Sequence, residues 1–312
     1  MNRRHFLQSS AALGLACAAA PAGLLAAPAK PASALRLTLL HTNDTHSRID
    51  PMDTGEHEGL GGVAGRKTMV DAWRAREKHV LLLDAGDVLQ GTPYFNLFKG
   101  EPEFKAMNEL GYLASAIGNH EFDAGIERLA ELVGGHARFP FLCCNYGLEN
   151  TPLLGKVKEY MIQEVDGLRV GILGLGIKLE GLVFPGFYGE VQYRDPIADA
   201  TRVAGVLKND EKCDFIIALS HLNIQSRSEG TYKDPQPGDR DLIRSVPEIN
   251  AIIGGHNHWL LPEPERAYRG EKHPMGYVAQ VGWAGTHLGV MQFDLFDEKR
   301  IALATGGPTP VA

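Results

Sequence analysis

The chain has 312 residues, of which 44% are hydrophobic and 22% are charged. This composition is typical of an ordinary globular protein and excludes a disordered or low-complexity chain. The formal net charge of −7 argues against binding to the phosphate backbone of a nucleic-acid polymer, which needs an excess of basic side chains.

Residues 1–34 have the features of a twin-arginine-type signal peptide and processing region. Arg3 and Arg4 precede an apolar run from Ser9 to Ala27, and small residues suited to cleavage follow. This pattern predicts export by the twin-arginine pathway to the periplasm or the medium. An ordinary secretory signal and an uncleaved anchor are the alternatives. Residues 1–34 hold three of the 31 basic and none of the 38 acidic residues, so residues 35–312 carry a charge of −10.

Residues 35–304 are predicted to form a single α/β domain. Short apolar runs predict buried strands at 35–40, 80–83, 139–143, 170–175, 215–219 and 251–253. Apolar residues at helical spacing predict core-facing helices at 126–133 and 197–207. The alternation at 291–295 predicts a strand at a partly antiparallel sheet edge. The last residues, 305–312, are predicted to be a disordered tail.

Cysteine use and hydropathy give two further predictions. After the signal segment three cysteines remain, Cys143, Cys144 and Cys213, and their odd number predicts buried thiols rather than a disulfide framework. Beyond residue 34, no apolar run reaches the roughly 18 to 20 residues that span a bilayer, so no membrane anchor is expected after signal cleavage.

Metal-binding side chains follow the predicted strands in five places. They are Asp44 and His46 in HTNDTH, Asp87 in DAGD, Asn119 and His120 in IGNHEFD, His221 after Leu-Ser, and His256 and His258 in GGHNH. Strand ends of an α/β sheet commonly build one site. Carboxylate, amide and imidazole ligands suit Mn²⁺, Fe²⁺, Zn²⁺ or Co²⁺ rather than Ca²⁺. If the backbone is extended, Asp44 and His46 point the same way, as do His256 and His258.

These stretches resemble the calcineurin-like metallophosphoesterases, and more narrowly the catalytic domain of the bacterial 5′-nucleotidase family. The similarity covers nearly all of residues 35–300 and also includes GGVAGR at 61–66, DAGDVLQGTPYFNLFKG, AMNELGYLASAIGNHEFDAG, DLIRSVPEINAIIGGHNH and QVGWAGTHLGV. The resemblance implies a four-layer α/β/β/α sandwich, in which two mixed sheets are flanked by helices.

The resemblance also implies a role for each site residue. One divalent metal ion would be held by Asp44, His46 and His258, the other by Asn119, His221 and His256, and Asp87 would bridge the two. His120 would not be a ligand but the general acid that protonates the leaving group, with Asp123 orienting its ring. The alternative for Asp123 is the N-cap of a helix over 124–134. Glu121 is expected to be a structural group.

The implied function is a binuclear-metal-dependent phosphoesterase that hydrolyses phosphate monoesters, nucleotides among them, by in-line attack of a metal-bound hydroxide. A phosphodiesterase or a thiosulfohydrolase of the same superfamily, and a non-catalytic metal-binding partner subunit, are the alternatives. Full-length 5′-nucleotidases carry a C-terminal nucleoside-recognition domain that has no counterpart before Ala312, so the substrate stays open and a separately encoded recognition partner is one hypothesis. The aromatic residues Tyr94, Phe95, Phe98, Tyr188, Trp259 and Trp283 are candidates to line a cleft, without an assigned role.

Overall fold

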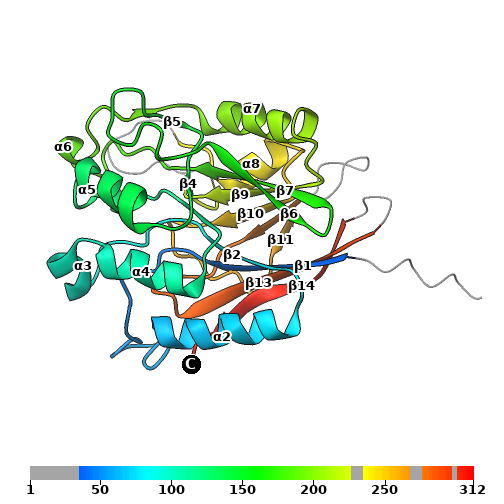
Figure 1. Cartoon of the computed structure of the whole chain (residues 1–312), viewed down its shortest axis with the longest axis horizontal. Coiled ribbons are helices and arrows are strands. Elements are labelled where there is room, and N and C mark those ends of the chain that lie inside the picture. Colours follow the sequence, from blue (N-terminus) through cyan, green and yellow to red (C-terminus); the bar gives the residue numbers. More distant parts are fainter. Residues whose placement is uncertain (1–34, 226–234, 268–275, 297–300) are drawn as a thin grey trace, which may run out of the picture. The chain divides into compact units, whose positions relative to one another are not determined.

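The alternation of apolar runs and helical patterns produces two mixed sheets with helices on their outer faces (Figure 1). The computed structural model describes residues 35–225, 235–267, 276–296 and 301–312, and residues from Ala34 to Ala312 form one compact unit. The predicted signal peptide at 1–34 lies outside the described residues.

The first sheet has the strand order β14-β13-β1-β2-β3-β4. Its strands are β1 (Leu35–Thr42), β2 (Val80–Asp84), β3 (Ala114–Ala116), β4 (Phe141–Leu142), β13 (His287–Leu295) and β14 (Ile301–Pro310). Strands β1 to β4 run parallel to one another, whereas β13 is antiparallel to β1 and β14 is antiparallel to β13. The carboxyl ends of β1, β2 and β3 therefore lie at the same edge of the sheet.

The second sheet has the order β11-β12-β10-β9-β7-β6. Its strands are β6 (Tyr160–Val165), β7 (Leu168–Leu175), β9 (Phe215–Ser220), β10 (Ala251–Gly254), β11 (Glu265–Ala267) and β12 (Gly276–Ala279). The inner strands β7, β9, β10 and β12 are parallel, and the outer strands β6 and β11 are antiparallel to their neighbours. A small separate sheet pairs β5 (Tyr146–Gly147) with β8 (Gln192–Tyr193).

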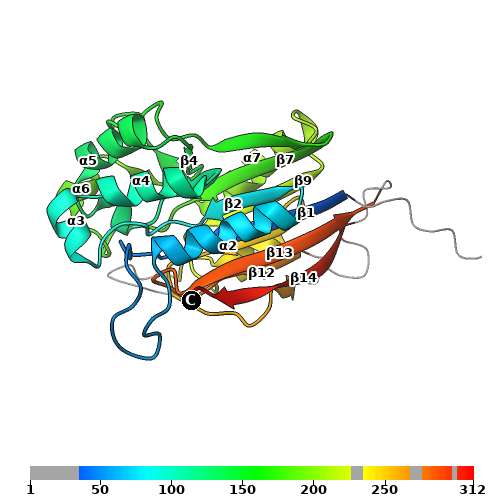
Figure 2. The same ribbon diagram turned by 60° about the horizontal axis from the view of Figure 1, so that its bottom comes forward.

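The helices are α2 (Val63–Arg76), α3 (Pro93–Phe98), α4 (Glu101–Leu110), η1 (His120–Phe122), α5 (Ile126–Glu131), η2 (Leu132–His136), α6 (Pro185–Tyr188), α7 (Pro196–Asn209) and α8 (Asp239–Ser245). Helices α2 and α4 lie on one side of the two sheets and α7 and α8 on the other, while α3, α5 and α6 lie toward one end (Figures 1 and 2). One apolar cluster joins α2, α4 and α5 to the first sheet, and another joins α7 and α8 to the second.

The central apolar cluster lies between the two sheets. Leu39 and Leu83 of the first sheet pack there with Phe215 and Ile253 of the second, and all four side chains are fully buried. The three apolar clusters thus lie between four layers, a helical layer, two sheets and a second helical layer, which confirms the predicted α/β/β/α sandwich. The six predicted strands are all present, although the run at 139–143 pairs only over β4.

The prediction of a disordered tail at 305–312 is wrong. Strand β14 pairs with β13 from Ile301 to Pro310, and Val311 is fully buried, with its N–H donating to Thr286 O and its C=O accepting from Gly61. The Gly and Pro content of this segment suggests disorder. A strand can still form there because backbone hydrogen bonds to β13 need no apolar side chains, and because prolines are tolerated on an edge strand. β14 is such an edge.

The prediction for the cysteines agrees with the structure. Cys143, Cys144 and Cys213 are free and buried, as expected for unpaired thiols. Among the described residues, none of the helices combines the length and the apolar character that crossing a bilayer requires.

Candidate metal centre

All of the predicted ligands lie where strands of both sheets end. Asp44 and His46 follow β1, Asp87 follows β2 and Asn119 follows β3, while His221 follows β9 and the pair His256 and His258 follows β10. The parallel direction of these strands within each sheet brings their carboxyl ends together. The structure gathers the side chains into two groups.

The first group contains Asp44, His46 and His258. Their ligand atoms all lie within 4.8 Å of one another, a spacing that can hold one metal ion. His46 Nε2 is 3.0 Å from His258 Nε2, which in turn is 3.4 Å from Asp44 Oδ1. The other nitrogen of His46, Nδ1, lies 3.3 Å from Leu89 O, which turns Nε2 toward the group.

The second group contains Asp87, His221 and His256, again with ligand atoms within 4.8 Å of one another. His221 Nε2 is 3.0 Å from Asp87 Oδ2, and His221 Nδ1 is 2.7 Å from Ala85 O. The amide of Asn119 belongs to the same place, because its Oδ1 is 2.9 Å from His256 Nδ1. Each predicted ligand therefore reaches one of the two groups.

The backbone conformation at the site differs from the one that the sequence reasoning assumed. Asp44, His46, Asp87, His256 and His258 all have positive φ, between 47° and 76°. A non-glycine residue in this left-handed region costs about 1 to 3 kcal/mol, and such residues concentrate at functional sites. The premise of an extended backbone is wrong for both pairs. Asp44 and His46 nevertheless reach the same group, as expected, whereas His256 and His258 point into different groups, as the family resemblance implied.

Hydrogen bonds hold this strained backbone in place. The N–H groups of Asp44 and His46 donate to the carbonyls of Gly86 and Asp87, so the loops after β1 and β2 are paired. The N–H of His256 donates to the carboxylate of Asp44 at 3.0 Å, which ties the second sheet to the first. The ligand loops thus stabilise one another.

Two glycines allow the loops to approach closely. A Cβ atom on Gly118 would lie 2.2 Å from Asp87 Oδ1, and one on Gly255 would lie 2.9 Å from His221 Nδ1 and 3.1 Å from Asp44 Oδ2. Neither position can accept a side chain without moving a ligand. The glycines directly before Asn119 and His256 were therefore a further sequence indication of the site, in addition to the chemistry of the ligands.

Glu121 links the loops that carry Asp87 and Asn119. Its fully buried carboxylate accepts hydrogen bonds from the N–H groups of Asp87 at 2.9 Å, Val88 at 2.7 Å, Leu89 at 3.4 Å and Gly118 at 2.6 Å. The expectation that Glu121 is a structural group is confirmed.

The electrostatics of the second group favour a cation. Burial opposes ionisation of Asp87, but His221, His120 and His46 outweigh it and hold the pKa of this carboxyl below its ordinary range. Burial likewise lowers the pKa of His221, yet Asp87, Asp44 and Glu121 outweigh it and raise that pKa to about 10. A site that keeps a proton on a fully buried imidazole is one whose carboxylates attract positive charge. The donor set and its charge fit divalent ions.

His120 stands beside the first group and is paired with Asp123. Its Nδ1 lies 2.7 Å from Asp123 Oδ2, and its ring centroid is 5.2 Å from that of His46. Helix α5 begins at Ile126 with Gly125 as N-cap, so the alternative role of Asp123 as the cap of that helix is wrong. Burial disfavours the charged ring, but the hydrogen bond to Asp123 and the charge of Asp87 outweigh it and raise the pKa of His120 to about 9.

One of the candidate aromatic residues, Trp283, lies at the site, in a contact with His258 that was not predicted. Trp283 stacks on His258, with ring centroids 5.6 Å apart and ring planes 5° from parallel. Trp283 reaches the site from the loop before β13, far from His258 in the chain, so no local pattern indicates the contact. Of the six aromatic residues that were candidates to line a cleft, only Phe95 is buried.

Comparison with known proteins supports the same interpretation. Residues 37–260 match the family model described as calcineurin-like phosphoesterase. The chain is 33% identical to a snake venom 5′-nucleotidase of Gloydius brevicauda over 89% of this chain and 48% of that protein. It is 37% identical to the 5′-nucleotidase of Vibrio cholerae over 78% of this chain and 45% of that protein.

A solved structure agrees with both sequence relatives. The 5′-nucleotidase precursor from Thermus thermophilus superimposes with a TM-score of 0.78 at 32% identity, covering 88% of this chain and 54% of that one. The chain thus spans about half the length of the relatives it matches. With two His/Asp groups that can each hold a metal ion, the chain belongs to the calcineurin-like phosphoesterases, as an enzyme related to the 5′-nucleotidases.

Proposed function

We propose that the chain is a binuclear-metal-dependent phosphomonoesterase that acts on nucleotides or other small phosphate esters. The observation that carries the proposal is the meeting of two metal-binding groups at one edge of the sandwich, with the His120–Asp123 pair beside them. The relatives named 5′-nucleotidase support a phosphate monoester as substrate.

The proposed ligand sets follow the two groups. Asp44, His46 and His258 would hold one ion, and His221, His256 and Asn119 would hold the other. Asp87 is proposed to bridge them. Its Oδ2 lies 3.0 Å from His221 Nε2 of the second group, and, against the effect of burial, the charges of His221 and of His46 in the first group both lower its pKa. Two cations bound there would supply a nucleophile at neutral pH and neutralise the charge that develops on the phosphoryl oxygens.

The chain's own contribution to proton transfer is His120. The hydrogen bond from Nδ1 to Asp123 fixes the ring and leaves Nε2 for the leaving-group oxygen. The ring is 32% exposed, so a substrate can reach it. The raised pKa keeps the ring protonated at neutral pH, although bound cations would lower this value because they compensate the charge of Asp87. These contacts support His120 as the general acid.

The test is a substrate panel on the protein supplemented in turn with Mn²⁺, Fe²⁺, Zn²⁺ or Co²⁺. The panel contains a nucleoside monophosphate, p-nitrophenyl phosphate, bis-p-nitrophenyl phosphate and a thiosulfonate. We expect phosphate release from the two monoesters. Preferential cleavage of the diester or the thiosulfonate would favour the other hydrolases, and metal binding without turnover on any substrate would favour the non-catalytic subunit.

Two further proposals rest on the sequence alone. Export by the twin-arginine pathway is proposed from Arg3, Arg4 and the apolar run after them, and replacing both arginines by lysine should leave the protein in the cytoplasm. A separately encoded recognition partner is also proposed, and co-purification from the native host checks it.

A further inference from the structure

The loop before β13 places one aromatic ring directly against the first metal-binding group. Trp283 stacks on His258, and its ring also forms an edge contact with His46, with centroids 6.4 Å apart and ring planes at 64°. Both imidazoles of the group therefore contact the same indole. The proposed ligands and the proposed general acid do not include Trp283.

His258 lacks the hydrogen bond that orients two of the other proposed ligands. The Nδ1 atoms of His46 and His221 each face a backbone carbonyl oxygen, at 3.3 Å and 2.7 Å. Histidine ligands are usually oriented in this way, through the second nitrogen of the ring. Within the described part of the chain, His258 Nδ1 has no such partner, and the side chain is 39% exposed. Apart from its contacts within the group, the stack on Trp283 is therefore what holds the ring of His258.

Trp283 is itself held by the segment that carries Asp44. Its neighbour Ala284 has a left-handed backbone, with φ 59°, and donates its N–H to Asp44 O at 2.7 Å. On the other side, Asn43 Nδ2 donates to Gly282 O at 2.7 Å and to Asp44 Oδ2 at 2.6 Å. Both chain neighbours of Trp283 are thus bonded to the segment of a proposed ligand. The position of the indole is therefore fixed by the chain and does not depend on an ion.

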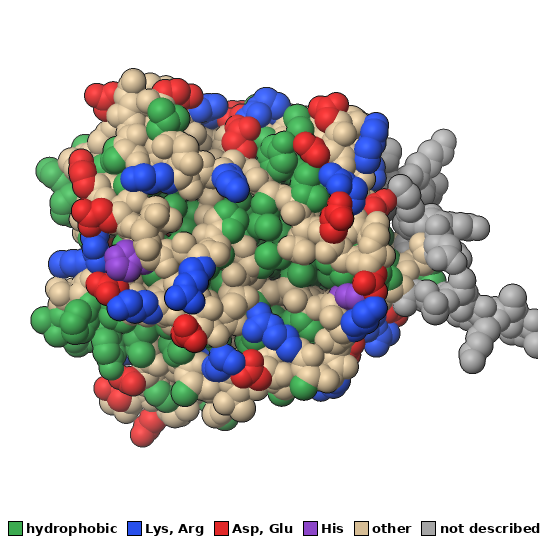
Figure 3. Space-filling view, in the orientation of Figure 1, with side chains coloured by type: hydrophobic (Ala, Val, Ile, Leu, Met, Phe, Trp, Pro, Cys, Tyr) green, Lys and Arg blue, Asp and Glu red, His purple; other side chains and the backbone are tan. Residues whose placement is uncertain are grey.

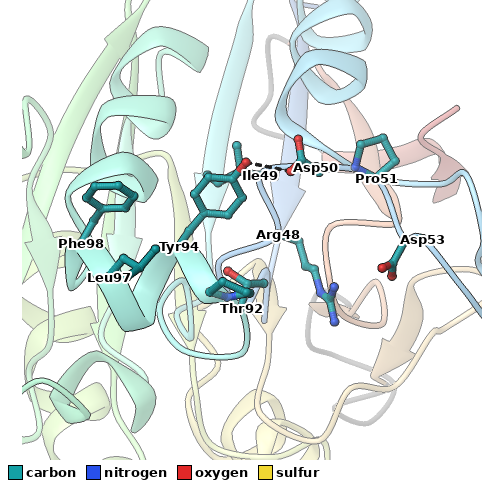
Figure 4. Close-up of a pocket in the computed structure, with 10 residues that line it drawn as sticks. Arg48, Ile49, Asp50, Pro51, Asp53, Thr92, Tyr94, Leu97 and Phe98 are labelled. Atoms are coloured by element: carbon teal, nitrogen blue, oxygen red, sulfur yellow. Dashed lines mark hydrogen bonds between the residues drawn. The ribbon is translucent and has the colours of Figure 1, made fainter.

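A second set of contacts ties the same turn to the loop after His46. The guanidinium group of Arg66 packs against Gly285, where an added Cβ would lie 3.0 Å from it. Arg66 Nη2 donates to Arg48 O at 2.9 Å. Figure 4 shows Arg48 among the residues that line a pocket of about 400 Å³ on this side of the molecule. The turn that presents Trp283 is therefore held on two sides.

We infer that Trp283 is a positioning residue of the first metal-binding group, whose indole fixes the ring of His258 and thereby raises the affinity of this group for a divalent ion. The inference rests on the proposed binuclear centre. Two physical effects contribute to it. A ring that is already oriented loses less conformational freedom when an ion binds. An imidazole that binds a cation also becomes more positive, so its stacking on the electron-rich face of an indole strengthens.

Calorimetric titration of the metal-free protein with Mn²⁺ tests the inference without a substrate. We expect Trp283→Ala to raise the Kd of one of the two ions by about 3- to 10-fold and to leave the other unchanged. Trp283→Phe keeps an aromatic face and should restore most of the affinity. In a His258→Ala background, replacing Trp283 should have no further effect on either Kd, because the ring that it orients is absent. A general loosening of the fold would instead weaken both ions.

Two variants serve as controls. Trp259 is 40% exposed and directly follows His258, but its ring lies against Arg240, with the guanidinium carbon 5.7 Å from the ring centroid. Phe98 is 51% exposed among the apolar side chains that Figure 3 shows gathered over α3. Trp259→Ala and Phe98→Ala should leave both Kd values unchanged.

Three results would overturn the positioning role of Trp283. They are an unchanged Kd in Trp283→Ala, an equal increase for both ions, and the same increase in Trp259→Ala. A further loss of affinity on replacing Trp283 in the His258→Ala background would also overturn it. If one Kd increases as expected while p-nitrophenyl phosphate is not hydrolysed, the positioning role stands and the proposed phosphatase function fails. If the ester is hydrolysed and both Kd values are unchanged, the positioning role fails alone.

Discussion

In both His120 and His221, Nδ1 contacts an oxygen atom of the protein. The two rings differ in the surroundings of their second nitrogen, Nε2. His221 Nδ1 contacts Ala85 O, and its Nε2 is fully enclosed beside Asp87. His120 Nδ1 contacts Asp123, and its ring is partly exposed. The enclosed nitrogen suits a ligand, whereas the accessible ring suits proton transfer to a substrate.

Replacing His120 by Asn tests this distinction. We expect the variant to retain both metal ions and to lose about 10²- to 10⁴-fold in kcat, the range for a lost general acid. Elemental analysis and steady-state kinetics measure the two quantities. His79→Asn is the control, since His79 is also paired with a carboxylate, Asp166, but lies before β2. Loss of metal from His120→Asn would show that His120 is a ligand.

Asp87→Asn tests the proposed bridge. An amide offers one neutral oxygen where the carboxylate offers two charged ones, so the metal content should fall from two ions to one or none per chain. Asp239→Asn is a matched control, because Asp239 is also fully buried but burial raises the pKa of its carboxyl, so the neutral amide removes little charge. Two ions retained in Asp87→Asn would contradict the bridging role.

The site was largely predictable at the scale of single residues. The candidate ligands come directly after strands and belong to few residue types, so position and chemistry indicated the cluster, and the family resemblance implied the role of each residue. The contacts of Trp283 with His258 and of Asn43 with Gly282 were not predictable, because each joins segments more than twenty residues apart. The left-handed backbone at Asp44 and His46 was missed because it depends on hydrogen bonds from the neighbouring loop.

At the scale of elements, Glu121 in η1 joins the loops that follow β2 and β3. Glu121→Ala would leave four N–H groups without their acceptor, so we expect a loss of about 3 kcal/mol or more in unfolding free energy and weaker metal retention. Urea unfolding with and without metal measures both. Glu127→Ala on the exposed face of α5 is the control. Equal stability of the two variants would show that the loops do not depend on Glu121.

The elements that the sequence predicted are those with a strong apolar signal. β1, β7, β9 and β10 are buried on both faces, and their continuous apolar runs reveal them. β3 was not delimited because it has three small residues, and β14 was taken for a tail because its Gly and Pro content hides an edge strand. Such segments become strands because they pair with strands that are distant in the sequence. A local sequence pattern carries no information about that pairing.

At the scale of the whole molecule, a buried neutral histidine sets part of the acid stability. His41 lies on β1 opposite Gly289, and burial lowers its pKa to about 3. The folded state therefore binds fewer protons than the unfolded state between about pH 6.5 and pH 3, so stability falls as the pH falls through this window. Between pH 7 and pH 5 the loss from His41 is about 2 kcal/mol.

His41→Leu should remove this contribution. The decrease in urea midpoint from pH 7 to pH 5 should be smaller in the variant than in the wild type, whatever the difference between them at pH 7. His136→Leu is the control, because His136 is partly exposed at the end of η2. Parallel pH profiles for wild type and His41→Leu would show that His41 does not titrate below its ordinary range.

We propose that two metal ions, one in each group, give this chain its phosphoesterase activity. The decisive experiment is a titration of metal-free protein with Mn²⁺, followed by phosphate release from p-nitrophenyl phosphate. We expect activity to rise to a plateau at two equivalents of metal per chain. A plateau at one equivalent, or no phosphate release at any loading, would show that the proposal is wrong.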